Sequence, residues 1–208
     1  MEPSPQNAES PAGAKASKGA QKAAKADAAA VESADADDAR ALRDKFFNDA
    51  AEHSPLVAVE TPHGFFLVST TDGNVGRSLF LKRTRGEFRA LQRGMSALEA
   101  IDAADRARSG LFIDVGANIG TSTVSALTKF GFEQGVALEP EPNNHFLLSI
   151  NIAANRLSSR VRTLQTAVSN ESGTAKLQVS PNKSGGHELR TRSGKKNCLL
   201  YTSPSPRD

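Results

Sequence analysis

Two acidic residues in the middle of the chain belong to short apolar runs, at a spacing that could bind a ligand. Asp114 lies near the end of the first run and opens a glycine-spaced turn, and Glu139 ends the second run about one helix later. A strand, a tight turn, a helix and a second strand with an acidic tip form the first unit of a nucleotide-binding α/β sheet. The pattern therefore predicts a bound nucleoside-like cofactor. The turn residues expected to line its site are Gly116, Asn118 and Gly120.

The chemistry of this turn indicates which cofactor it would take. Gly116 permits a sharp backbone turn at the end of the strand, and Gly120 lets the next helix begin close to the sheet. A dinucleotide site spaces its glycines as G-x-G-x-x-G and seats a pyrophosphate on the helix N-terminus, where a carboxylate such as Asp114 would repel it. The same carboxylate favours a cofactor with a cationic, amino-acid-bearing end. S-adenosylmethionine is such a cofactor, because it carries a sulfonium and an ammonium and no phosphate.

Glu139 lies at the tip of the second predicted strand, where a carboxylate can accept hydrogen bonds from both hydroxyls of a ribose. Pro140 closes that strand. An acid after a strand is often only a helix cap, so each acid alone is a weak signal. The two acids at this interval favour a cofactor site over two unrelated caps.

Hydrophobic periodicity predicts the elements that position these residues. In chain order they are a helix over 38–51, two β runs within 56–68 around a Pro-His-Gly turn, a helix over 87–104, a strand over 111–115, a helix over 120–130, a strand over 135–139, a helix after Pro142, a strand over 160–167, a turn at 170–173 and a strand over 174–179. The first helix carries an apolar stripe of Leu42, Phe46 and Phe47.

The helix after Pro142 is expected to be capped by Asn143 or Asn144. Its predicted inner face consists of Phe146, Leu147, Ile150 and Ala154. Strands that alternate with crossover helices imply an α/β fold with a right-handed parallel sheet. A doubly wound sheet normally continues beyond its third strand, so we expect the chain to hold only the N-terminal, cofactor-binding half.

The end of the chain differs in composition from the rest. Cys198 and Tyr201, the only cysteine and the only tyrosine, both lie in the last eleven residues. These residues resemble the translation of a sequencing-adapter end, and a genuine disordered tail is the alternative. We therefore expect a gene model cut near Lys195. A single thiol cannot form an internal disulfide or a cysteine metal cluster, and His53 and His63 have no partners at metal-ligand spacing, so no metal site is expected.

Composition limits the remaining function classes. Net charge is +3 and the pI is about 9.1, with basic residues scattered among acids, which favours a solvated surface over a nucleic-acid site. Residues 1–39 are rich in Ala and Lys and offer little to bury, so we expect a disordered extension. No apolar run is long enough to span a membrane, and no secretory signal is evident. The sequence therefore predicts a soluble, cytoplasmic protein without a membrane partner.

Three blocks of sequence closely resemble the FkbM family of S-adenosylmethionine-dependent methyltransferases. They are F-I-D-V-G-A-N-I-G over 112–120, A-L-E-P-E-P over 137–142 and L-S-I-N-I-A-A-N over 148–155. The segments at 167–169 and 173–175 and the region from Thr61 to Glu87 are similar to the family as well. The resemblance covers roughly 56–189. It implies a class I methyltransferase (Rossmann-like) fold and O-methylation of a sugar or natural-product hydroxyl, so a small molecule or carbohydrate would be the acceptor.

Matching positions assign roles to the site residues by resemblance. Asp114, Gly116, Asn118 and Gly120 would line the methionine end of the cofactor, Glu139 would hold the ribose with Pro140 beside it, and Ala167 would lie near the adenine. Asn151 and Asn155 are expected to brace their helix against neighbouring loops. His187, in the loop Ser184-Gly185-Gly186-His187, is either a general base for a hydroxyl or a polar loop residue. No catalytic residue is therefore assigned from the sequence.

The family's fourth strand, with its acidic motif, and everything after it have no counterpart in the chain. Because methyl transfer depends on aligning acceptor and methyl, we expect this chain to be inactive and marginally folded, with exposed apolar sheet edges. The expected segments are the disordered extension over 1–39, a leader helix, β-hairpin and helix over 40–110, the truncated α/β domain over 111–192 and a non-native tail over 193–208. A dinucleotide-dependent oxidoreductase and a nucleic-acid-binding protein with a basic tail are the alternatives.

Overall fold

A computed structural model of the chain describes residues 37–169, 174–178, 188–190 and 198–202. The chain divides into two compact units, residues 1–44 and residues 45–208. The division falls inside the first helix, which covers residues 37–51. This helix confirms the element predicted over 38–51. Within the second unit, Phe47 of this helix is buried and packs on Phe80 with ring centroids 5.3 Å apart.

The predicted stripe of this first helix is only partly correct. Phe46 remains 57% exposed, although its ring stacks on that of Phe80. Phe47 alone contributes a buried aromatic side chain from residues 45–51. Adjacent residues on a helix point about 100° apart, and of this pair only Phe47 is buried.

The predicted β-hairpin is confirmed as β1 (Leu56–Thr61) and β2 (Gly64–Ser69), which pair antiparallel. Helix α2 (Val75–Lys82) follows and packs on the hairpin. The residues between β2 and α2 are ordered by Asp72, whose carboxylate accepts hydrogen bonds from the amides of Asn74 and Gly76 at 2.9 and 2.8 Å. This arrangement is an Asx-type turn that leads into the helix.

The helix predicted over 87–104 ends earlier in the structure, at Glu99. Helix α3 (Gly86–Glu99) ends in a turn in which Asp102 adopts a positive φ of 54°, and helix α4 (Ala104–Arg108) follows. Periodicity alone extended α3 too far, because the left-handed residue that ends a helix is usually glycine and here is an aspartate. Met95 and Phe88 are the buried residues of α3.

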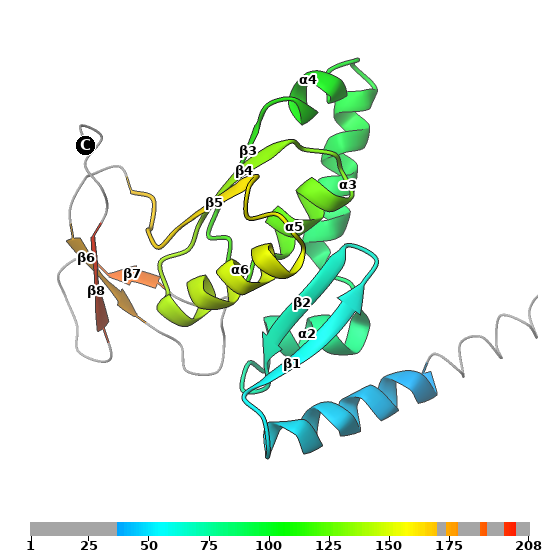
Figure 1. Cartoon of the computed structure of the whole chain (residues 1–208), viewed down its shortest axis with the longest axis vertical. Helices are drawn as coiled ribbons and strands as arrows, with labels where there is room; N and C mark the ends of the chain where they lie inside the picture. Colours follow the sequence, from blue (N-terminus) through cyan, green and yellow to red (C-terminus); the bar gives the residue numbers. More distant parts are fainter. Residues whose placement is uncertain (1–36, 170–173, 179–187, 191–197, 203–208) are drawn as a thin grey trace, which may run out of the picture. The chain divides into compact units, whose positions relative to one another are not determined.

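The site is built on a parallel sheet, so the predicted α/β fold is confirmed. Its strands are β3 (Leu111–Val115), β4 (Gln134–Leu138) and β5 (Val161–Leu164), in the order β3-β4-β5. Helix α5 (Thr121–Thr128) connects β3 to β4, and helix α6 (Pro142–Ala154) connects β4 to β5. Both helices contact strands of the sheet and also β2 (Figure 1), so they form a layer between the sheet and the hairpin.

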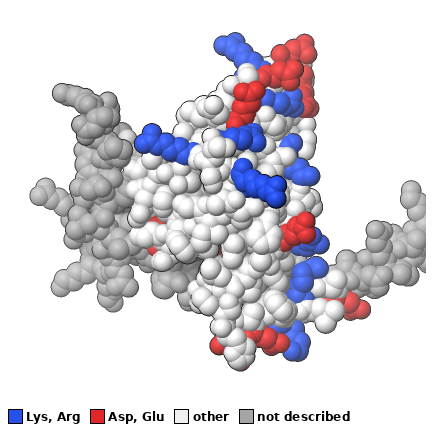
Figure 2. Space-filling model, in the orientation of Figure 1, with Lys and Arg blue, Asp and Glu red and all other residues white. Residues whose placement is uncertain are grey.

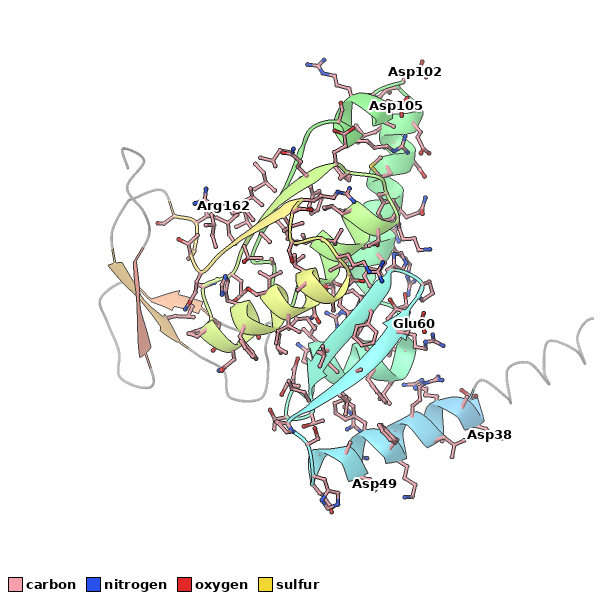
Figure 3. The ribbon with its side chains drawn as sticks, viewed as in Figure 1. Asp38, Asp49, Glu60, Asp102, Asp105 and Arg162 are labelled. Atoms are coloured by element: carbon pink, nitrogen blue, oxygen red, sulfur yellow. The ribbon has the colours of Figure 1, made fainter. Side chains whose placement is uncertain are left out.

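The two faces of this sheet differ in burial. The register places Phe112, Gly135 and Val161 in one row, on the face that is covered by helices. The opposite face carries Leu111, Ile113 and Val115, which are 51%, 60% and 60% exposed. Arg162 of β5, labelled in Figure 3, is paired with Val136 and shares this second face. Parallel sheets are normally covered on both faces. The sequence predicts exposed apolar sheet edges, and the structure shows exposed apolar side chains on one face of β3, which is an edge strand.

Helix α6 corrects two details of the prediction. Its N-cap is Glu141, whose carboxylate accepts a hydrogen bond from the amide of Asn144 at 2.7 Å, rather than Asn143 or Asn144. Its buried residues are Asn144, Leu147, Leu148, Asn151 and Ile152, whereas Phe146 is 59% exposed. A pattern that counts only apolar residues misses a buried asparagine, and this shifts the predicted inner face.

The strand predicted over 160–167 is shorter in the structure, because β5 ends at Leu164 and Ala167 lies beyond it. The last described strands form a separate antiparallel sheet, β7-β6-β8, from β6 (Thr174–Gln178), β7 (Glu188–Arg190) and β8 (Cys198–Thr202). Strand β8 comes from the segment predicted to be a non-native tail. The predicted turn at 170–173, the loop 184–187 with His187 and most of the extension over 1–39 lie outside the described residues. Among the described residues, no helix is long and apolar enough to cross a membrane.

Candidate functional site

The turn between β3 and α5 has a backbone path that few sequences can adopt. Gly116, Asn118 and Gly120 all have positive φ values, of 76°, 52° and 89°. Glycine adopts such values readily, and asparagine tolerates them better than most other residues. The glycine and asparagine spacing noticed in the sequence is therefore explained first by the backbone conformation. We call residues 114–120 the site loop.

Hydrogen bonds that its amides donate to the end of β4 hold the site loop in place. The amides of Gly116 and Ala117 both donate to the carbonyl oxygen of Leu138, at 2.9 and 3.0 Å. The amide of Asn118 donates to the Glu139 carboxylate at 2.8 Å. The loop is thus attached to the tip of the neighbouring strand through three of its amides, which is how a strained backbone is kept in one conformation.

Glu139 is 4% exposed and lies at the carboxyl end of β4. One of its carboxylate oxygens accepts the Asn118 amide, and the other accepts the amide of Glu141 at 3.0 Å. Main-chain donors of this kind stabilise a buried carboxylate. The fold brings Glu139 and Asn118 into contact, as a shared cofactor site requires.

Asp114 faces the beginning of α5 rather than the other turn residues. Its carboxylate accepts a hydrogen bond from the hydroxyl of Thr123 at 2.6 Å. Burial raises the pKa of Asp114 above its ordinary value of 3.8, bonds from Thr123 oppose the shift, and the charge of Glu87 adds to it. Asp114 and Glu87 also line a cavity of about 430 Å³ between α3 and β3, whose other walls are mostly apolar.

The two glycines of the motif serve different purposes. A methyl group added at Gly120 would lie 2.8 Å from Cδ1 of Leu148, so this glycine lets α6 pack against the start of α5. A methyl group added at Gly116 would meet no heavy atom within 4 Å, and Gly116 is exposed. The space above Gly116 is therefore open to a ligand that approaches the backbone. This openness fits a cofactor whose end lies against the turn.

The remaining predicted site residues lie at the same end of the sheet, beyond the carboxyl ends of its strands. Pro140 is half-buried directly after Glu139, and the Glu139 amide donates to the carbonyl of Leu164, the last residue of β5, at 3.0 Å. Ala167 is half-buried three residues after β5. The predicted site residues thus lie at or near the carboxyl ends of β3, β4 and β5, where α/β sheets bind ligands. Two of them do not face the open turn, because the Asp114 carboxylate points to α5 and Gly120 is buried against Leu148.

Three contacts near the site were not specified by the sequence, although Asn151 was expected to brace its helix against a neighbouring loop. Thr123 binds Asp114, Glu141 binds both Glu139 and the start of α6, and Asn151 donates from its side chain to the carbonyl of Ile119 at 2.9 Å. Glu141 could have been found, because proline favours the first position of a helix and the residue before it is then the cap. The other two contacts depend on packing that no local pattern reports. No group of three His, Cys, Asp or Glu side chains suited to a metal ion occurs among the described residues.

Comparison with known proteins gives one partial sequence relative. Methyltransferase sdnD of Sordaria araneosa is 34% identical to the chain over 88 residues, which are 42% of this chain and 34% of the relative. The chain therefore spans about a third of the length of the relative it matches. No family model matches the chain, so membership of the FkbM family stays a prediction.

Solved structures similar to the chain include a putative transferase, PH0793, from Pyrococcus horikoshii, M. jannaschii TYW2 in complex with AdoMet and the M. jannaschii tRNA m1G37 methyltransferase. Their TM-scores are 0.39, 0.38 and 0.38, each at 15% identity. They cover 54%, 53% and 54% of this chain, and the chain covers 37%, 43% and 29% of them. Scores this low support no conclusion about the fold or function of this chain.

Proposed function

We propose that the chain carries the S-adenosylmethionine-binding part of a methyltransferase. The observation that carries this proposal is the contact between Glu139 and the Asn118 amide, beside the open space at Gly116. It places a buried carboxylate next to an exposed backbone turn at the ends of two parallel strands. The partial relative sdnD, itself named a methyltransferase, supports the same reading.

When bound, S-adenosylmethionine supplies an electrophilic methyl group on a sulfonium. The chain's own residues would bind and orient it. Glu139, with Pro140 beside it, would accept hydrogen bonds from the ribose, and Ala167 would border the adenine. Asp114, Gly116, Asn118 and Gly120 would line the amino-acid end, where the Asp114 carboxylate would attract a cation when it is ionised.

Asp114 also argues against a dinucleotide in this site. A pyrophosphate binds where a helix N-terminus offers its amides and its positive dipole end. In this protein the carboxylate of Asp114 already binds Thr123 in the first turn of α5. A pyrophosphate at the N-terminus of α5 would lie beside the negative charge of an ionised Asp114. It would also find the hydroxyl of Thr123 already donating to that carboxylate.

Calorimetric titration of the 208-residue chain tests the cofactor proposal. We expect saturable binding of S-adenosylmethionine and of S-adenosylhomocysteine, and no binding of NAD. A variant with both Asp114→Ala and Glu139→Ala should lose binding of the two nucleosides. Saturable binding of NAD, or unchanged binding of S-adenosylmethionine by the double variant, would contradict the proposal.

For the whole protein we propose methyl transfer to a hydroxyl group of a sugar or natural product. This step follows from the resemblance of the site loop and its neighbours to the FkbM family. The chain spans about a third of its partial relative, so transfer is proposed for the full-length protein rather than for these residues alone. Transfer of a labelled methyl group to hydroxyl-bearing small molecules by the full-length protein tests it, and labelling of RNA or protein instead would refute it.

A further inference from the structure

We propose that Asn151 is a positioning residue that couples the β1–β2 hairpin to the site loop. Asn151 lies on α6 and is completely buried. Its side chain binds the backbone of β2 on one side and the backbone of the site loop on the other. The proposal deepens the proposed function, because the loop that Asn151 holds is the one assigned to the cofactor.

Asn151 of α6 and Asn155, the C-cap residue of this helix, bind the edge of β2 in the same way. The carboxamide of Asn155 accepts from the amide of Phe65 at 2.9 Å and donates to its carbonyl at 2.6 Å. The carboxamide of Asn151 accepts from the amide of Leu67 at 2.7 Å and donates to its carbonyl at 3.2 Å. Residues two apart on a strand and four apart on a helix are separated by similar distances of about 6–7 Å. The two side chains therefore pair with β2 much as a neighbouring strand would.

Only Asn151 extends this arrangement to the site loop. Its side-chain nitrogen also donates to the carbonyl of Ile119 at 2.9 Å, whereas that of Asn155 donates to the carbonyl of Asn151 itself at 2.8 Å. Ile119 lies between Asn118 and Gly120, the two positive-φ residues at the end of the loop. The bond fixes the direction of a carbonyl in the most strained part of the loop, one residue from the amide that binds Glu139.

The chemistry of this position requires both a donor and an acceptor. Asn151 accepts one hydrogen bond and donates two, which uses both N–H groups of a carboxamide. An aspartate of the same shape would accept from Leu67 but would face the carbonyls of Leu67 and Ile119 with a negative charge. An apolar residue would leave all three backbone groups without this partner. The bonds to β2 and the bond to the site loop therefore depend on the same side chain.

A pair of alanine variants separates the effect of the bond to the site loop from the effect of the bonds to β2. Asn151→Ala and Asn155→Ala each remove a paired bond to β2, and both should lower the free energy of unfolding. Only Asn151→Ala removes the bond to Ile119. We expect it to raise the Kd for S-adenosylmethionine about tenfold, the effect of losing roughly one hydrogen bond, while Asn155→Ala changes the Kd less than about twofold. Equal weakening by the two variants would overturn the proposal.

Hydrogen exchange distinguishes failure of this inference from failure of the proposed function. Without any ligand, Asn151→Ala should speed exchange of the Asn118 amide more than Asn155→Ala does, relative to the wild-type chain. Unchanged exchange at Asn118 would refute the coupling even if the cofactor binds. If the wild-type chain binds no S-adenosylmethionine, the proposed function fails, and the exchange result alone then decides the role of Asn151.

A measurement on the unmodified protein keeps the test valid when Asn151→Ala does not fold. The side-chain amide signals of Asn151 and Asn155 are followed by NMR during titration with S-adenosylmethionine. We expect the Asn151 signals to shift and the Asn155 signals to change much less, since only Asn151 contacts the loop. Saturable binding that leaves the Asn151 signals unmoved would overturn the proposal.

Discussion

Asp114 and Glu139 are both carboxylates near the tips of neighbouring strands, but their surroundings differ. Glu139 accepts hydrogen bonds from two main-chain amides. Asp114 is bound by Thr123, yet its burial and the charge of Glu87 outweigh that bond and raise its pKa. The two residues therefore lend themselves to different tests, one based on hydrogen bonding and one based on pH.

Replacing Glu139 with glutamine should disrupt the site loop and the start of α6 together. A carboxamide keeps one oxygen acceptor but turns its NH2 group toward the amide of either Asn118 or Glu141, so one bond is lost. Because the position is buried, we expect the free energy of unfolding to fall by about 1–3 kcal/mol. Urea denaturation measures this loss. Glu133→Gln, at an exposed position, is the control and should change stability by less than about 0.5 kcal/mol.

Asp114→Asn should change the pH dependence of stability. Because the pKa of Asp114 is raised in the folded protein, the folded state binds its proton more readily than the unfolded chain does. Ionising Asp114 therefore costs stability as the pH rises from the ordinary value of 3.8 through the raised pKa. Asparagine does not titrate, so the stability of the variant relative to wild type should increase from acid to neutral pH. A relative stability that is constant or decreases over this range would contradict the assignment.

At the scale of elements, the hairpin is attached to the helical layer by polar contacts from two helices. Asn151 and Asn155 bind β2 from α6. From α5, the Thr128 hydroxyl donates to the carbonyl of His63 at 2.7 Å, and the His63 ring contacts the Ser125 hydroxyl at 2.8 Å. Asn151 thus braces α6 against a loop as predicted, through the carbonyl of Ile119. Both asparagines also bind the strand β2, which was not predicted.

Gly64→Ala should loosen this attachment. Gly64 has a φ of 144°, and a methyl group there would lie 2.6 Å from Cγ1 of Val124 and 2.8 Å from Oδ1 of Asn155. Backbone strain and the clash together should cost about 2–4 kcal/mol of unfolding free energy. Thermal or urea denaturation measures the loss.

Gly94→Ala is the matched control for this substitution. Gly94 lies inside α3, where an added methyl group meets nothing within 4 Å. Alanine favours a helix interior over glycine by about 0.5–1 kcal/mol, so this variant should be more stable than wild type. If the two alanine variants had the same effect, the close approach at Gly64 would not be what matters.

At the scale of the whole molecule, apolar and charged surfaces are distributed unevenly. The exposed row of Leu111, Ile113 and Val115 lies on β3, one of the two edge strands of the parallel sheet. On the face shown in Figure 2, Lys and Arg are interspersed with Asp and Glu and form no continuous basic stripe. Such mixing is typical of a solvated surface. An exposed apolar row on a sheet edge is, by contrast, a common cause of self-association.

We expect the chain to self-associate through this row. The double variant Ile113→Thr and Val115→Thr keeps β-favouring residues but removes apolar surface. It should weaken association about tenfold or more, because burying each branched side chain contributes roughly 1.5–3 kcal/mol. Sedimentation velocity over a range of concentrations measures the change. Phe146→Gln removes a single exposed aromatic from α6 and should leave association unchanged; an equal effect of the two variants would exclude the β3 row as the contact.

The sequence by itself determined the local features of this protein. Strand β3, the hairpin turn at Pro62-His63-Gly64 and the glycine and asparagine positions of the site loop follow from periodicity and from backbone preference, which neighbouring residues set. The placement of Asp114 and Glu139 at adjacent strand ends followed as well, because parallel strands joined by helices end at one edge.

Only the tertiary structure decided which groups those residues meet. Asp114 binds Thr123, Glu139 binds the Asn118 amide, and Asn151 connects β2 to Ile119. The last of these contacts joins residues up to 84 positions apart. Local propensity carries no information about such pairs, because a buried asparagine is recognised only when the backbone groups that satisfy it have been brought together by packing.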